Sequence, residues 1–89
     1  MKVNLKTLPM APTEAVKAAV NKYIMQLDNP RITTADVYMK TENRHQVAEI
    51  VVHGNKMNLF AKADTENMYR SIKEAVRKIQ TQMRRKMNH

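Results

Sequence analysis

The chain has 89 residues, a formal net charge of +8 and no cysteine. This length accommodates one hydrophobic core, so we expect a single domain over residues 1–89, and the lack of cysteine excludes a disulfide framework, a thiolate metal site and a thiol nucleophile. The excess of 16 basic over 8 acidic residues favours a phosphate-rich partner, nucleic acid before a membrane surface.

The first predicted elements are a strand and a helix. Val3 and Leu5 alternate with polar residues over residues 2–7, which is the period of a half-buried strand. After a proline-containing break, Thr13 is a good helix N-cap. The apolar residues of one helical face follow it: Val16, Val20, Tyr23 and Leu27. This helix is predicted to end before Pro30.

Three strands are predicted next, because apolar and polar residues alternate in segments 34–42, 47–53 and 56–63. Gly54 and Asn55 lie between the last two segments, and both residue types tolerate the positive φ of a tight hairpin turn. We therefore expect the sheet to be mostly antiparallel.

A final helix is predicted from the apolar spacing of the C-terminal segment, with Asp64 or Thr65 as its N-cap. Its core face is expected to contain Met68, Tyr69, Ile72, Ala75, Val76, Ile79 and Met83. The order of elements is then strand, helix, three strands, helix. Because both helices can cover one face of the sheet, we predict an α+β fold, a two-layer βαβββα sandwich with a four-stranded sheet.

The last helix carries a large excess of positive charge. Residues 67–89 contain seven basic side chains against one acid, Glu74. Four of the basic residues form a stripe opposite the core face, more than about 20 Å long: Arg70, Lys73, Arg77 and Arg84. Lys78 and Arg85 flank this stripe. A solvated helix face normally mixes signs, whereas such a ridge matches a line of phosphates, so a nucleic-acid contact is the favoured interpretation.

The face of the sheet away from the helices is predicted to carry Tyr38 and Phe60 among lysines. Two aromatic rings in this setting are compatible with stacking of RNA bases, but an exposed cross-strand cluster is the favoured interpretation. The full predicted set is Lys2, Asn4, Lys6, Tyr38, Lys40, Val51, Lys56, Phe60 and Lys62.

No catalytic, metal or membrane site is predicted. His45, His53 and His89 lack the spacing of a metal site, and the sequence has no phosphate-binding glycine loop or nucleophile elbow. We therefore expect a non-enzymatic protein without a cofactor. No apolar run approaches the roughly 20 residues of a membrane span, and the N-terminus lacks a signal-peptide core, so we expect a soluble cytoplasmic protein.

Several segments resemble the ribosome hibernation promoting factor family, also called the ribosome-associated inhibitor or S30AE family. "ADTENMYRSI", residues 63–72, resembles the A-x-x-x-D/N-M-Y-x-A/S-I segment that opens the second helix of that family. "AEIVVHGNKMNL", residues 48–59, resembles its hairpin, and "KIQTQM", residues 78–83, its K-L-x-x-Q-L. Thr13 is similar to its helix start, and Lys40 falls at its strand spacing.

The resemblance implies a domain that enters the messenger and transfer RNA channel of the small ribosomal subunit, contacts 16S ribosomal RNA and silences vacant ribosomes. Similarity to the short form of the family implies inactive paired ribosomes, a second hibernation factor as a further partner, and a monomer away from the ribosome. The expected RNA-binding residues are Lys17, Lys22, Lys40, Arg70, Lys73, Arg77, Lys78, Arg84, Arg85 and Lys86. Lys78 and Arg85 match basic positions of the family, whereas Lys73 and Arg77 stand where its members carry acids.

Two other functions remain open at this point. A generic double-stranded RNA-binding module would use the same basic helix on any A-form duplex, with comparable affinity for each. A basic protein-interaction adaptor would dock on an acidic partner and would be purified free of RNA.

Overall fold

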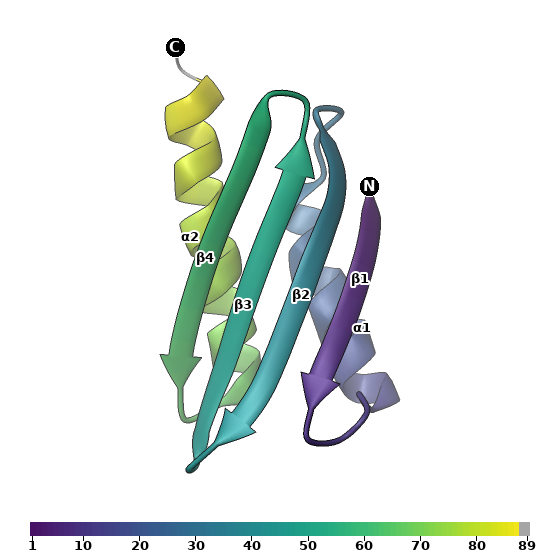
Figure 1. Ribbon diagram of the computed structural model, residues 1–89, viewed down its shortest axis with the longest axis vertical. Helices are drawn as coiled ribbons and strands as arrows, with labels where there is room; N and C mark the ends of the chain where they lie inside the picture. The colour runs from purple at the N-terminus through teal and green to yellow at the C-terminus, as the bar shows by residue number, and fades with distance from the viewer. Residues whose placement is uncertain (88–89) are drawn as a thin grey trace.

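The computed structural model describes residues 1–87; His89, one of the three histidines considered above, lies outside them. The elements are β1 (Lys2–Leu8), α1 (Glu14–Ile24), the short 3-10 helix η1 (Met25–Leu27), β2 (Ile32–Glu42), β3 (His45–Gly54), β4 (Met57–Thr65) and α2 (Met68–Met87). Both helices lie on one face of a four-stranded sheet (Figure 1). The predicted α+β fold, with its βαβββα order, is confirmed.

The strands lie side by side in chain order, β1-β2-β3-β4. β1 and β2 are parallel, because α1 carries the chain back to the end at which β1 began. The other two pairs are antiparallel hairpins. α1 and α2 therefore begin at the same end of the sheet and run in the same direction behind it (Figure 1).

The β2–β3 turn was not predicted from the sequence. Asn43 and Arg44 join Glu42 to His45, and their φ angles are 48° and 67°. Positive φ at both central residues is the pattern of a type I′ turn, whose twist matches that of the flanking strands. Asn adopts positive φ readily, but Arg seldom does, so the sequence Asn-Arg does not predict this turn.

At the β3–β4 turn, the expectation of positive φ at Gly54 and Asn55 is wrong. The positive angle falls on Lys56, with φ of 57°, so Lys56 lies in the turn and not on the sheet face predicted for it. Gly54 is required for a different reason: an added Cβ would lie 2.2 Å from the backbone oxygen of Arg31. That oxygen accepts a hydrogen bond of 2.8 Å from the backbone N–H of Asn55.

The two helices begin at residues with capping side chains. The Thr13 hydroxyl accepts a hydrogen bond from the Val16 N–H at 3.2 Å, which confirms the predicted cap of α1. For α2, the prediction of Asp64 or Thr65 is wrong, because both residues belong to β4. The Asn67 side chain instead accepts hydrogen bonds from the backbone N–H groups of Tyr69 and Arg70, at 2.9 and 3.1 Å.

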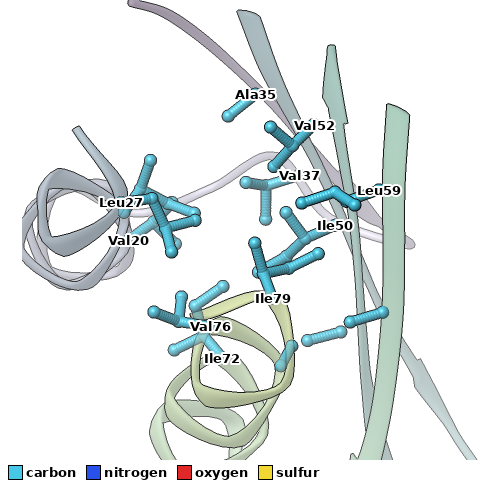
Figure 2. Packing of buried hydrophobic residues seen from close by; sticks show 14 of the residues in the cluster. Val20, Leu27, Ala35, Val37, Ile50, Val52, Leu59, Ile72, Val76 and Ile79 are labelled. Atoms are coloured by element: carbon cyan, nitrogen blue, oxygen red, sulfur yellow. The ribbon is translucent and has the colours of Figure 1, made fainter. Parts of the chain in front are cut away.

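The core fills the space between the helices and the inner face of the sheet. Val20 of α1 and Leu27 of η1 approach Ile72 and Ile79 of α2, and all four face the sheet around Ile50 (Figure 2). Each of these side chains is at most 1% exposed. Burial on this scale holds both helices in fixed orientations, so their outer faces are presented rigidly to solvent.

The predicted core face of α2 is wrong at Tyr69, which is 45% exposed. Ser71 is buried instead, at 0% exposure. Its hydroxyl donates to the backbone oxygen of Gln46 at 2.6 Å and lies 2.6 Å from the Thr65 hydroxyl, so this buried polar group is satisfied. The chain thus closes the core with a small polar side chain and leaves the aromatic ring outside.

Candidate nucleic-acid interface

The outer face of α2 carries the predicted basic stripe. At about 100° per residue, its four members lie within an arc of about 60°, and they span about 21 Å along the axis. These residues, Arg70, Lys73, Arg77 and Arg84, are all exposed. The stripe stands on a rigid element, since the opposite side of the same helix is packed into the core.

Little negative charge compensates this stripe. Arg70 Nε lies 3.2 Å from Glu74 Oε1, an i,i+4 ion pair on the helix surface. Among residues 1–87, the structure contains no ion pair to Lys73, Arg77 or Arg84. These three cations are therefore available to external anions.

Lys78 was expected beside the stripe as a free cation, but its side chain is hydrogen-bonded to the sheet. Its Nζ donates a hydrogen bond of 2.7 Å to the backbone oxygen of Lys62, and Gln82 Nε2 donates one of 2.7 Å to that of Phe60. Both acceptors belong to β4, which is an edge strand. These two side chains satisfy carbonyls on the open edge of the sheet, where a further strand would otherwise pair.

The end of α2 adds three more cations. Arg84, Arg85 and Lys86 occupy the last turn, and all three are exposed. Cations at this position interact favourably with the helix dipole, so part of their role is structural. Arg85 follows Lys78 by seven residues and shares its flank, whereas Lys86 lies on nearly the opposite side of the helix from Arg84.

The predicted residues of α1 are exposed but do not form one surface. Lys17 Nζ lies 3.2 Å from Glu14 Oε1 and is partly neutralised by it. Lys22 follows five residues later, about 140° further around the helix axis. α1 packs beside α2, but the structure does not bring these two lysines together with the stripe.

Lys40 is separated from the other predicted residues by the sheet. It is half-buried on β2, its neighbours Val37 and Met39 are core residues, and Lys40 follows them onto the opposite face. There Lys40 Nζ lies 3.3 Å from Glu42 Oε2. The fold does not bring Lys40 to the basic face of α2.

The open face of the sheet mixes charges of both signs. Lys62 lies 3.9 Å from Glu49, and Asp36 accepts a hydrogen bond of 2.9 Å from Asn4. The strand register gives the order across the centre of this face as Lys6, Tyr38, Glu49 and Lys62. Basic side chains therefore have acidic neighbours on this face, whereas most of those on the outer face of α2 do not.

The two aromatic residues of the open face are not neighbours. Tyr38 is on β2 and Phe60 on β4, so β3 separates them. Val51 of β3 lies directly opposite Phe60, and Glu49 directly opposite Tyr38. Phe60 is 53% exposed. The register places Val51 beside Phe60, an arrangement that suits the cross-strand interpretation.

Neither a cluster of potential metal ligands nor a membrane-spanning helix is found among the described residues. Within residues 1–87 no group of three or more potential metal ligands comes together. The His45 ring nitrogen lies 2.9 Å from Asp64, and His53 lies 3.0 Å from Asn58, so each histidine has a local partner. No helix in this part of the chain is long and apolar enough to cross a membrane.

Comparison with known proteins places the chain in a family. Residues 3–88 match the S30AE family, described as sigma 54 modulation protein / S30EA ribosomal protein. The chain belongs to this family. Members of the S30AE family are ribosome-associated factors rather than enzymes, so this protein is a ribosome-associated, non-enzymatic factor. No curated protein matches the sequence.

Two solved structures share the S30AE fold. A ribosomal subunit interface protein from Coxiella burnetii is 13% identical, with a TM-score of 0.92 and 100% of both chains covered. The N-terminal domain of Protein Y from Thermus thermophilus is 24% identical, with a TM-score of 0.88, covering 96% of this chain and 98% of that one. At these identities the likeness shows the fold alone.

Proposed function

We propose that this protein is a ribosome hibernation factor, in which the single domain of residues 1–89 binds the small ribosomal subunit and contacts 16S ribosomal RNA. The observation that carries the proposal is the basic stripe on the outer face of α2, three of whose four cations form no ion pair within residues 1–87. Membership of a ribosome-associated family supports the ribosome as the partner, and the charge supports RNA as the component contacted.

The stripe forms the centre of the proposed contact. Arg70, Lys73, Arg77 and Arg84 meet phosphates along the groove of an RNA helix. Arg85 flanks them, and Lys86 adds a cation at the end of the helix. Lys78 lies at the margin of the stripe, and Lys17 and Lys22 contact RNA separately, from α1. Lys40 is on the opposite side of the domain. It contacts RNA only if the domain sits in a channel whose walls carry RNA on both sides.

The proposed mechanism is occlusion and needs no chemical step. Phosphate contacts fix the position of the domain without reading base sequence. A rigid domain held in the messenger and transfer RNA channel then excludes both RNAs, and translation is silenced. As the family resemblance implies, the protein favours inactive paired ribosomes, with a second hibernation factor as a further partner, and is a cytoplasmic monomer away from the ribosome.

The test is co-sedimentation of the purified protein with vacant small subunits at near-physiological salt, in the presence of excess total duplex RNA. Binding that survives the competitor supports recognition of the ribosome. Loss of binding to the competitor would replace the proposal with a generic double-stranded RNA-binding module. Absence of binding to both subunits and RNA would replace it with a protein-interaction adaptor.

A further inference from the structure

An open hollow of ≈ 360 Å³ lies between the last turn of α1 and the first turns of α2, at the end of the basic stripe where α2 begins. The side chains that line it are Tyr23, Tyr69, Arg70, Lys73, Glu74 and Arg77. Two aromatic rings and three cations thus border one space.

Tyr69 has no structural role that explains its position. Its side chain is 45% exposed, and no residue among 1–87 forms a hydrogen bond with its hydroxyl. Tyr23 differs, because it is half-buried and packs against the core. Tyr23 therefore belongs to the wall of the hollow, whereas the ring of Tyr69 is accessible to a ligand.

The neighbours of Tyr69 determine which ligand suits the hollow. Lys73 and Arg77 follow it at i+4 and i+8, and Arg70 is adjacent, so cations stand beside the ring along the helix. Aromatic rings bind the flat faces of nucleobases, and arginine and lysine bind phosphates. In a duplex, both faces of each base are already stacked on neighbours, so a ring of this kind reaches only an unpaired base.

We propose that this hollow receives an unpaired nucleotide of RNA, with its base stacked on Tyr69 and its adjoining phosphates on Arg70, Lys73 and Arg77. The inference rests on the proposed function, since it assumes that RNA lies along α2. It goes further in one respect. The stripe alone would bind continuous and interrupted RNA duplexes equally, whereas Tyr69 makes the surface prefer a duplex with an adjacent unpaired nucleotide.

The first experiment uses the variant Tyr69→Trp. The chain contains no tryptophan, so the new side chain is the only indole reporter. Its emission is measured during titration with two RNA duplexes of equal charge, one continuous and one with part of its length unpaired as an adenosine loop. We expect quenching by the looped RNA and little by the continuous duplex. Phe60→Trp, on the open face of the sheet, is the matched control and should respond to neither.

The second experiment measures affinity for the same two RNAs. Tyr69→Leu should bind the looped RNA about tenfold more weakly, which is the scale of one base–aromatic stack, and bind the duplex as before. Tyr69→Phe keeps the ring and should keep the affinity. Because Tyr69 is largely outside the core, unchanged thermal unfolding of both variants is expected, and it shows that an altered affinity does not come from unfolding.

Three results would overturn the inference. Unchanged affinity of Tyr69→Leu for the looped RNA would exclude stacking, and an equal loss for both RNAs would exclude a preference for unpaired bases. Quenching of Tyr69→Trp by free adenosine monophosphate at the same concentrations as by RNA would assign the hollow to a mononucleotide. In each case, wild-type binding to vacant small subunits is scored separately, so failure of the stacking inference leaves the proposed function standing.

Discussion

The outer face of α2 and the open face of the sheet are both exposed and both rich in lysine or arginine, but their charges are arranged differently. On the sheet, Lys62 stands near Glu49 and Lys40 near Glu42. On α2, Lys73 and Arg77 are i,i+4 neighbours of the same sign. The two faces therefore differ less in the number of their cations than in the number of acids that pair with them.

The energetic consequences of the two arrangements have opposite signs. Opposite charges paired across strands stabilise a sheet by roughly 0.2–1 kcal/mol per pair. Like charges at i,i+4 on a helix cost a few tenths of a kcal/mol. Folding therefore accounts for the paired charges of the sheet but not for the like-charged neighbours Lys73 and Arg77 of α2, and an anionic partner would relieve their repulsion.

The largest effect is expected from reversing the stripe. The triple variant Lys73→Glu, Arg77→Glu, Arg84→Glu should bind vacant small subunits roughly a hundredfold or more weakly, because three attractions to phosphates become repulsions. The matched control reverses Lys2, Lys6 and Lys62 on the open face of the sheet, with the same change in net charge. Co-sedimentation should show nearly normal binding for this control.

An equal loss of affinity in the two triple variants would mean that only net charge matters. The proposed difference between α2 and the open face of the sheet would then be wrong. Thermal unfolding is measured in parallel, and both variants are expected to remain folded, since all six side chains lie outside the core.

The salt dependence of binding should sharpen the same comparison. Replacing Lys73, Arg77 and Arg84 by glutamine should reduce the slope of log affinity against log salt by about 2 to 3, at roughly 0.7–0.9 for each phosphate that is no longer neutralised. Replacing Lys2, Lys6 and Lys62 by glutamine should leave the slope unchanged. A titration between low and physiological salt measures both values, and equal slopes would contradict the assignment of the stripe.

Lys78 and Lys73 should behave as a reciprocal pair. Lys78→Met removes the hydrogen bond to the Lys62 carbonyl at the sheet edge, so the free energy of unfolding should fall by about 1 kcal/mol, with a small change in affinity. Lys73→Met removes a cation that makes no ion pair within residues 1–87, so affinity should fall and stability should not. Denaturant unfolding and subunit binding of the two variants test this. A large loss of affinity in Lys78→Met with unchanged stability would show that Lys78 is a main RNA contact.

The smallest effect is expected at the one acid of α2. Glu74→Gln removes a negative charge beside the stripe and releases Arg70 from its ion pair, so affinity should rise about threefold, a change expected for a single exposed charge. Glu49→Gln on the sheet is the control and should change nothing. Equilibrium binding at low salt measures both, and weaker binding of Glu74→Gln would show that Glu74 positions Arg70 for the contact.

Sequence periodicity predicted the elements and the core well, because each buried face of a strand or helix requires apolar residues at a regular spacing. The alternation around Val37 and Met39 and the helical spacing of Ile72, Val76 and Ile79 are required by packing, and the structure confirms each of them. The Thr13 cap was predictable for a similar local reason, since its hydroxyl meets the N–H three residues later.

The details that sequence reasoning missed depend on distant parts of the chain. Gly54 is required by the approach of Arg31, which is far from it in sequence. The burial of Ser71 is tolerated because Gln46 of β3, 25 residues earlier in the chain, supplies an acceptor for its hydroxyl. Lys78 is held by the exposed edge of β4, and no pattern within α2 reveals which flank meets that edge.

The most direct test of the central claim is lysine footprinting of the unaltered protein. Free and subunit-bound protein are acetylated briefly, and the modification of each lysine is compared by mass spectrometry. If the stripe is the contact, Lys73 on α2 becomes protected while Lys2 and Lys6 on the sheet stay reactive. Protection of Lys2 and Lys6 with continued reactivity of Lys73 would contradict it and place the ribosome on the other face of the molecule.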